Sequence, residues 1–225
     1  MDGDRIMIWF TSDFHFGHEK DFLWKPRGFS SWEEHAEQVI TRYNEVVDDE
    51  DTVYILGDCM LKNDDFGIYC LRQLKGHKYL AIGNHDSDAR IERYKQENIF
   101  EDIQYGYRIR NGKCDIYAQH YPAMMGNYKD KHPVICLAGH THSPDKFQNM
   151  ANGCYNVALD AHGCYPVQLG TALTDIFIYR AAHPVPAYPD RSPYCSSCRN
   201  QYGCEARTRY DIMCPGYDPM NGGTF

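Results

Sequence analysis

Five short apolar runs in this chain each end in residues of the kind that bind metal ions. The runs are MIWFTSDFH, VYILGD, YLAIGNHD, DIYAQH and VICLAGHTH, in that order along the sequence. Runs of this length and composition predict buried β-strands. In open α/β sheets, ligands bind where the strands finish. Strand ends that carry Asp, Asn and His therefore predict an α/β fold with one shared polar site, and this pattern favours a dinuclear metal centre.

The candidate ligands offer carboxylate or amide oxygens and imidazole nitrogens, and none of them is a cysteine. They are Asp13, His15, Asp58, Asn84, His120, His140 and His142. This mixture suits Mn²⁺, Fe, Zn²⁺, Co²⁺ or Ni²⁺ rather than Ca²⁺ or a thiolate cluster. The set is too large for one tetrahedral ion and fits two ions that share a carboxylate. Asp58, on a Gly57-Asp58 turn, is the predicted bridging residue.

The ordered motifs Asp-x-His, Gly-Asp, Gly-Asn-His-Asp and Gly-His-x-His resemble the signature of the calcineurin-like metallophosphoesterases, in particular their small, cap-less bacterial and phage members. The resemblance covers residues 6 to 180. It includes Gln119-His120-Tyr121-Pro122, which is similar to the family's His-Tyr-Pro element. It also includes residues 156–167, which look like the strand pair that closes small members. The resemblance implies a β-sandwich of mixed sheets flanked by helices.

The resemblance also implies a role for each candidate residue. Asp13, His15, Asp58 and His142 would bind one metal ion, and Asp58, Asn84, His120 and His140 the other. His85 would contact phosphate or protonate the leaving oxygen, and Asp86 would orient it. Two cations about 3.5–4 Å apart can lower the pKa of a bridging water from about 15.7 towards ~7, supplying hydroxide that attacks phosphorus. We expect two divalent ions, Mn²⁺ first, with Fe, Zn²⁺, Ni²⁺ or Co²⁺ as alternatives.

Two segments that leave the metal motifs are rich in aromatic and basic residues. One spans residues 17–29, and the other spans residues 124–129 after His120. Aromatic and cationic side chains together suit a nucleobase with a phosphate. The predicted substrate contacts are His18, Trp24, Arg27, Lys62 and Tyr128, where Lys62 follows the Gly-Asp motif at a place where many relatives carry Arg or Asp. Alternatively, Trp24 and Phe29 cover the edge of the core, and His18 caps its own loop.

Periodicity predicts the remaining elements. Capping-box patterns at Ser30 and Ser31 predict a helix over residues 32–47. Further helices are expected from residue 63 or 64 to 74 and from 89 to 96. Strands are expected near 6–11, 52–57, 78–83, 114–119, 133–138, 154–159 and 174–180. Together these elements predict a sheet sandwich flanked by helices.

The composition changes near residue 183, where residues 182–189 form a proline-rich, extended connector. The predicted division is a metallophosphoesterase domain over residues 1–182 and a cysteine-rich tail over 183–225. The tail cysteines are Cys195, Cys198, Cys204 and Cys214. The opening Cys-x-x-Cys suggests a small structural Zn²⁺ site, although the later spacings match no zinc signature. An iron–sulfur cluster and free thiols are the alternatives, and the tail could serve as a docking module for nucleic acid or protein.

Charge and hydropathy limit the partners. A net charge of −8 argues against sequence-independent binding to duplex nucleic acid. No apolar run approaches the ~20 residues needed to span a bilayer. The N-terminal residues lack the basic and long apolar regions of a signal peptide, so a cytoplasmic location with reduced cysteines is expected. The cysteines outside the tail are expected to be small buried residues.

The sequence therefore predicts a metal-dependent phosphoester hydrolase. We favour a phosphodiesterase acting on a small nucleotide or on single-stranded nucleic acid, because a compact core without a large cap leaves the metal centre accessible. A phosphomonoesterase or a pyrophosphohydrolase on the same site is the nearest alternative. A non-catalytic binding scaffold is the alternative from another class. The natural ester, the physiological metal and the oligomeric state do not follow from the sequence.

Overall fold

The computed structural model describes residues 6–123, 133–148, 150 and 153–183, together with the strand residues 217–218 and 223–224. The chain divides into two units, Met1–Ile178 and Tyr179–Phe225. In the second unit, β10 (Tyr217–Asp218) and β11 (Gly223–Thr224) pair as antiparallel strands. The predicted zinc ligands Cys195, Cys198, Cys204 and Cys214 and the predicted substrate contact Tyr128 lie outside the described residues, so their roles stay predictions.

The first sheet has the strand order β4-β3-β2-β1-β9. Its strands are β1 (Ile8–Thr11), β2 (Thr52–Ile55), β3 (His77–Ala81), β4 (Asp102–Gln104) and β9 (Val167–Gln168). The strands β1 to β4 run parallel, and β9 lies antiparallel to β1. Because parallel strands finish at the same edge of a sheet, the polar motifs after β1, β2 and β3 are brought together there.

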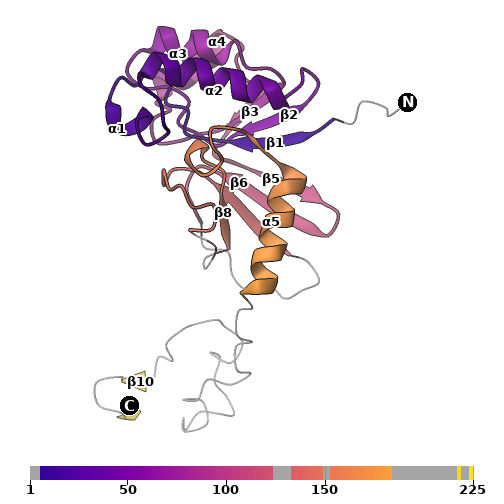
Figure 1. The fold of residues 1–225 in the computed structure, drawn as a ribbon. Helices are drawn as coiled ribbons and strands as arrows, with labels where there is room; N and C mark the ends of the chain where they lie inside the picture. The colour runs from indigo at the N-terminus through magenta and orange to yellow at the C-terminus, as the bar shows by residue number, and fades with distance from the viewer. Residues whose placement is uncertain are drawn as a thin grey trace. The chain divides into compact units, whose positions relative to one another are not determined.

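Three helices, α2 (Trp32–Val46), α3 (Asp64–Leu71) and α4 (Asp88–Gln96), cover one face of this sheet (Figure 1). All three are predicted from the sequence and confirmed. α2 begins with a capping box, in which the Ser31 hydroxyl accepts from Glu34 N at 3.1 Å and the Glu34 carboxylate accepts from Ser30 N at 2.7 Å. Its Val39 and Tyr43 are fully buried in the core. A short helix, α1 (Asp21–Trp24), precedes it.

The second sheet lies on the face of the first sheet opposite these helices (Figure 1). Its order is β5 (Gly106–Asn111), β6 (Cys114–Gln119), β7 (Val134–Ala138) and β8 (Cys154–Asn156). β5 and β6 are antiparallel, whereas β6, β7 and β8 are parallel. The expected pair of mixed sheets flanked by helices is therefore present, and the polar residues after β6 and β7 stand at one edge of the second sheet.

The two sheets meet where their polar ends lie. A parallel bridge joins Ser12, directly after β1, to Ala158, which follows β8. Leu159 N donates to Ser12 O at 3.3 Å, which holds the 3₁₀ turn η2 (Leu159–Ala161) beside β1. Between the sheets, Tyr107 packs against Tyr54 and Tyr79. This seam brings the motifs of the first sheet against those of the second.

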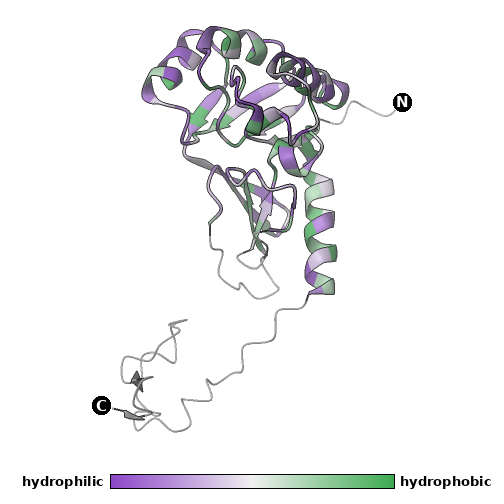
Figure 2. Ribbon diagram, turned by 60° about the vertical axis from the view of Figure 1, so that its left-hand side comes forward, coloured by the Kyte–Doolittle hydropathy of each residue, from purple (hydrophilic) through white to green (hydrophobic). Residues whose placement is uncertain are grey.

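The strand expected at residues 174–180 is wrong, because these residues belong to the helix α5 (Leu169–Ala182). The run is rich in β-branched and aromatic residues, which favour a strand by local propensity. Ala172 and Ile176, spaced as on one helical face, are buried instead. Asp175 on the same helix accepts from Lys146 Nζ at 2.6 Å and from Tyr155 OH at 2.7 Å. In Figure 2, hydrophobic residues (green) occur along most of α5.

The expected closing strand pair within residues 156–167 is also wrong. β8 pairs with β7 in the second sheet, while β9 pairs with β1 in the first sheet. The strands β4 and β5 are absent from the sequence-based expectation. β4 has only three residues, and β5 alternates apolar residues with exposed arginines, so neither forms a continuous apolar run.

The cysteines outside the tail are buried, as expected. They are Cys59, Cys70, Cys114, Cys136, Cys154 and Cys164. Within the described part of the chain, no helix combines the length and apolar character needed to cross a bilayer.

Candidate metal centre

The turns after β1 and β2 are held together by main-chain hydrogen bonds. Asp13 N donates to Gly57 O and His15 N donates to Asp58 O, both at 3.0 Å. In the second sheet, the turns after β6 and β7 are joined to each other, because Gly139 N donates to His120 O at 3.1 Å. His120 joins this pair to the first sheet, because its Nδ1 donates to Leu56 O at 2.8 Å. The candidate ligands are thus carried on rigid strand ends rather than on free loops.

Most of the candidate ligands have an unusual backbone conformation. Asp13, His15, Asp58, His140 and His142 have φ values of 62°, 48°, 57°, 71° and 48°. Such left-handed conformations cost of order 1–3 kcal/mol each for residues other than glycine, and they gather at functional sites. The cost is accepted here because each turn must aim a side chain at the same point.

Glycines allow the motif turns to approach closely. Gly57 has φ 88°, and a Cβ there would lie 2.6 Å from His120 Nδ1. A Cβ at Gly139 would collide with the side chains of Ser12 and Asp13. The glycines of the Gly-Asp and Gly-His motifs are therefore required by the packing of one strand end against another.

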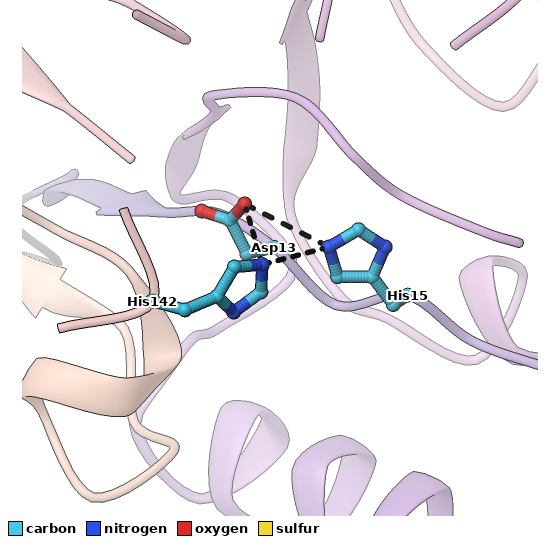
Figure 3. Close-up of side chains that lie close together, drawn as sticks. All are labelled: Asp13, His15 and His142. Atoms are coloured by element: carbon cyan, nitrogen blue, oxygen red, sulfur yellow. Dashed lines mark hydrogen bonds and ion pairs between the residues drawn. The ribbon is translucent and has the colours of Figure 1, made fainter. Parts of the chain in front are cut away.

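One group of donor atoms consists of Asp13, His15 and His142 (Figure 3). His15 Nε2 and His142 Nε2 are 3.1 Å apart, and they lie 3.8 Å and 3.6 Å from Asp13 Oδ1. Asp13 Oδ2 accepts from Ser12 OH at 2.6 Å and from His140 N at 2.9 Å. Its Oδ1 is buried and has no hydrogen-bond partner among the described residues. A buried carboxylate oxygen of this kind is costly unless a cation lies against it.

A second group consists of Asp58, His120 and His140, with Asn84 beside them. His120 Nε2 lies 2.8 Å from Asn84 Oδ1 and 3.2 Å from His140 Nδ1. The other ring nitrogen of His120, Nδ1, donates to the Leu56 carbonyl at 2.8 Å. This bond fixes the tautomer, so that the Nε2 lone pair faces the group.

Asp58 stands between the two groups. Its Oδ2 lies 3.5 Å from His15 Nε2 and 3.6 Å from His120 Nε2. Its Oδ1 accepts from His85 N at 2.8 Å, which holds the carboxylate in place. One oxygen that faces both donor groups is the arrangement that a bridging ligand requires.

Electrostatics favours cations at this place. Burial, followed by the neighbouring His142 and Arg27, lowers the pKa of His15 to about 2, so this ring is neutral and keeps a free lone pair. Burial also raises the pKa of Asp58, against the opposing effect of His120. The neutral ring of His15 and the unpaired, buried Oδ1 of Asp13 fit divalent ions of the Mn²⁺, Fe or Zn²⁺ kind. The His and Asp groups can therefore bind metal ions.

His85 lies beside the two groups, and Asp86 does not orient it. His85 forms a third donor group with His15 and Asp58, and its ring centroid is 5.3 Å from that of His15. Asp86 Oδ2 accepts from Asp58 N and Gly83 N at 2.8 and 2.9 Å. Its Oδ1 accepts from Cys59 N at 3.2 Å and Tyr94 OH at 3.0 Å. The expected orienting role of Asp86 is wrong, because both carboxylate oxygens already brace the turns after β2 and β3.

Arg27 is not placed to contact a substrate. Its side chain is 1% exposed, and it forms an ion pair with Asp160 at 2.8 Å. Its Nη1 lies 2.9 Å from Nε2 of His35, and burial, followed by Arg27, lowers the pKa of His35 to about 3. Although burial acts to raise it, the pKa of Asp160 is held well below its usual range by hydrogen bonds from His142 and Arg27. The expected substrate contact at Arg27 is corrected to a buried structural ion pair.

The other predicted contacts lie at the rim of the centre or away from it. His18 is buried, and its ring centroid is 6.3 Å from that of His15. Burial lowers the pKa of His18, and the nearby charge of Lys62 lowers it further. Its Nδ1 accepts from Lys20 N at 3.3 Å, which is the loop-capping alternative. Trp24 packs against the core and Phe29 is buried in it, in accord with the alternative that they cover the core edge.

Asp160 is a site residue that the sequence analysis does not identify. It follows the apolar run YNVAL, and therefore has the same strand-then-carboxylate pattern as the other motifs. Its side chain accepts from His142 Nδ1 at 3.1 Å. The strand expected at residues 154–159 forms over Cys154–Asn156, and Asp160 follows it in η2. An Asp after this apolar run is the signal that could have identified it.

A pocket of about 330 Å³ opens next to the second donor group. Its lining residues are Ile82, Gly83, Tyr105, Gln119, His120 and Tyr121. Tyr105 is 84% exposed and Tyr121 is 50% exposed. The ring of Tyr121 lies 4.7 Å from that of His140 and 5.0 Å from that of His120. Two exposed aromatic rings thus border a hollow that reaches a candidate metal ligand.

Comparison with known proteins places the chain beside a phage protein. No family model matches the sequence. The gene 66 protein of Mycobacterium phage L5 is 31% identical over 163 residues, covering 60% of this chain and 77% of that protein. The structure of a protein of unknown function, AQ665 from Aquifex aeolicus, aligns with a TM-score of 0.59 and 23% identity, over 78% of this chain and all of that one (100%). A novel archaeal phosphodiesterase aligns with a TM-score of only 0.39 and 18% identity, over 68% of this chain and 82% of that one. The Aquifex likeness concerns the fold alone.

Proposed function

This chain belongs to the family of the gene 66 protein of Mycobacterium phage L5, and we propose that it is a phosphoester hydrolase that uses two divalent metal ions. The observation that carries the proposal is the pair of donor groups that share Asp58. One oxygen of this buried carboxylate lies 3.5 and 3.6 Å from ring nitrogens of the two groups. Paired sites of this kind are typical of enzymes that cleave phosphate esters.

The geometry supports one set of residues for each ion. Asp13, His15, Asp58 and His142 would bind one ion, and Asp58, Asn84, His120 and His140 the other. When bound, the ions would polarise the phosphoryl oxygens and make hydroxide available near neutral pH. The ligand types suit Mn²⁺, which we propose first, as well as Fe, Zn²⁺, Ni²⁺ and Co²⁺.

His85 is the candidate for direct contact with the substrate. It is only partly buried, and it lies next to His15 and Asp58. An imidazole in that place can donate a hydrogen bond to a phosphoryl oxygen or a proton to the leaving oxygen. Its backbone is fixed on both sides, because His85 N donates to Asp58 and His85 O accepts from Arg90 Nη1 at 2.7 Å. The chain itself therefore holds this ring at the edge of the centre.

The substrate that we favour is a phosphodiester with a nucleoside or another planar group. Support comes from the pocket beside His120, which is bordered by the exposed rings of Tyr105 and Tyr121. Aromatic rings of this kind stack on nucleobases without regard to sequence. A small nucleotide or single-stranded nucleic acid would therefore fit. A phosphomonoesterase or a pyrophosphohydrolase on the same centre is the alternative, and a binding scaffold without turnover is the alternative from another class.

The test is turnover by metal-stripped protein that is refilled with one metal at a time. We expect Mn²⁺ to restore cleavage of bis-p-nitrophenyl phosphate more than that of p-nitrophenyl phosphate. The Asp58→Asn variant should lose this activity, whereas Glu92→Gln, which changes an exposed residue of α4, should keep it. A preference for the monoester would transfer the proposal to a phosphomonoesterase. If neither ester nor any nucleotide diester is cleaved with any of the metals, the proposal that this chain is an enzyme is contradicted.

A further inference from the structure

The donor group of Asp13, His15 and His142 contains one residue that needs support from elsewhere. Asp13 and His15 are buried and held by their surroundings. His142 is different, because its side chain is 36% exposed. An imidazole at the surface can rotate, and in its neutral form it can carry the proton on either ring nitrogen. A fixed His142 with a free Nε2 therefore requires a partner at Nδ1.

Asp160 supplies that partner. His142 Nδ1 donates to Asp160 Oδ2 at 3.1 Å. A carboxylate can only accept, so the proton must lie on Nδ1, and the Nε2 lone pair is left to face His15 Nε2 and Asp13 Oδ1. Asp160 reaches this position because η2 is held against the end of β1, where Leu159 N donates to Ser12 O.

Arg27 fixes Asp160 in turn. Its Nε donates to Asp160 Oδ1 at 3.0 Å and its Nη2 donates to Asp160 Oδ2 at 2.8 Å. Nη2 also donates to Asp13 O at 2.8 Å, and Nη1 lies 2.9 Å from Nε2 of His35. This two-pronged contact, in a side chain that is 1% exposed, leaves the carboxylate one orientation. Arg27 therefore connects the backbone of one ligand, Asp13, to the ring of another, His142.

In the second donor group, the support behind His120 is of a different kind. The Nδ1 of His120 donates to a main-chain carbonyl, Leu56 O, at 2.8 Å. A carbonyl of the main chain is neutral and cannot be removed by a side-chain substitution. A carboxylate behind a ligating histidine makes that histidine a stronger ligand, and its loss typically costs 10–100-fold in metal affinity.

We propose that Asp160 and Arg27 are positioning residues for one half of the metal centre, in which they hold His142 in the orientation and tautomer that bind the ion of the Asp13 group. The proposal rests on the metal centre of the proposed function but not on its reaction. It predicts that the affinity for one ion can be lowered while the affinity for the other stays unchanged.

The test is titration of the metal-stripped protein with Mn²⁺ by calorimetry, combined with electron paramagnetic resonance to distinguish a coupled pair of ions from a single one. Wild type should bind two ions and give the coupled spectrum. Asp160→Asn should bind one ion as in wild type and the other 10–100-fold more weakly. At limiting Mn²⁺ its spectrum should be that of a single ion.

Two further variants separate positioning from folding. Asp160→Asn leaves Arg27 buried without its counter-charge, which destabilises the fold. The double variant Arg27→Met with Asp160→Leu removes both charges and keeps apolar bulk, so it should fold yet still lose the same ion. Asp175→Asn is the matched control. Like Asp160, Asp175 accepts hydrogen bonds from two side chains, here those of Lys146 and Tyr155, but it lies on α5. It should keep both affinities.

The outcomes are distinct. The proposal is overturned if Asp160→Asn and the double variant both lose affinity for the two ions equally. It is also overturned if neither variant loses affinity for any ion. A wild type that binds no ion would overturn it together with the proposed function. Two ions without ester turnover would overturn the proposed function only, and the comparison of variants would still decide the role of Asp160 and Arg27.

Discussion

The two halves of the candidate metal centre are supported by different chemistry. In the half that contains His142, the support is a buried ion pair between Arg27 and Asp160, whose partners lie 133 residues apart in the sequence. In the half that contains His120, the support is the main chain, through Leu56 O. The turns that carry Asp58 and Asn84 are held separately by one buried side chain, because their main-chain N–H groups donate to the Asp86 carboxylate.

This difference affects how each half responds to change. Main-chain support is built into the strands of the first sheet, so it persists as long as the sheet is folded. Support from an ion pair depends on two side chains, and either can be lost by one substitution. The half with His142 should therefore be the easier one to empty, and the half with His120 the more robust.

A substitution at Asp58 should affect both halves of the centre together, and it has the largest expected effect on metal binding. Its Oδ2 faces both halves, so Asp58→Asn removes the one charge that they share. The loss of a direct ligand should lower the affinity for each ion by more than roughly 100-fold, which is the largest loss typical of a residue that only supports a ligand. Calorimetric titration with Mn²⁺ measures this, and a variant that loses only one ion would show that Asp58 does not bridge.

Asp86 tests the turns that carry Asp58 and Asn84. Asp86→Ala leaves the N–H groups of Asp58, Cys59 and Gly83 without their acceptor. Losing a buried charged acceptor of this kind should lower the free energy of unfolding by about 3–5 kcal/mol. Urea unfolding of the metal-free protein measures the change. Tyr94→Phe is the control, because it removes a single hydrogen bond to the same carboxylate and should cost only about 1 kcal/mol.

His35 tests the half that depends on the ion pair, through pH. Burial, with Arg27 second, lowers its pKa to about 3 in the folded protein, against 6.5 ordinarily. Between these values the unfolded chain binds a proton at His35 and the folded protein does not, so stability falls as the pH decreases below about 6.5. The contribution of this group approaches about 1.4 kcal/mol per pH unit. His35→Gln should flatten the decline in urea unfolding from pH 6.5 to 4, and an unchanged slope would contradict the assignment.

The sequence predicts the halves unequally, for a physical reason. The candidate ligands follow strands, and a strand with a polar end is a local pattern, so the sequence selects these residues and the structure brings them together. Arg27 has no such local signal. Its basic, aromatic neighbourhood favours a substrate contact, whereas its partners Asp160 and His35 become neighbours only when the chain folds.

The errors in the fold have a similar origin. The residues 174–180 have strand propensity, but the burial of Ala172 and Ile176 and the bonds to Asp175 favour a helix. The partners of Asp175 are distant in sequence, since Lys146 follows β7 and Tyr155 lies in β8. The role expected of Asp86 fails in the same way, because its adjacency to His85 in sequence says nothing of the two turns that its carboxylate joins. Local patterns therefore predict what each strand ends in, and tertiary bonds decide what supports it.

The smallest expected effect concerns the substrate side of the half with His120. The pocket with Tyr105 borders His120 and Gly83 but none of the residues around His142. If a nucleobase stacks on Tyr105, Tyr105→Ala should raise KM about fivefold for a nucleoside p-nitrophenyl diester, corresponding to roughly 1 kcal/mol of stacking.

The matched substrate is ethyl p-nitrophenyl phosphate, which has the same leaving group and no base, so its KM should stay unchanged. Tyr117→Ala is the matched variant, because Tyr117 is 37% exposed on β6 and does not line the pocket. An equal rise in KM for both esters would mean that Tyr105 supports the pocket rather than a base. Unchanged affinity for both Mn²⁺ ions in Tyr105→Ala would then confine the effect to substrate binding, since stacking beside His120 requires no change in what holds either ion.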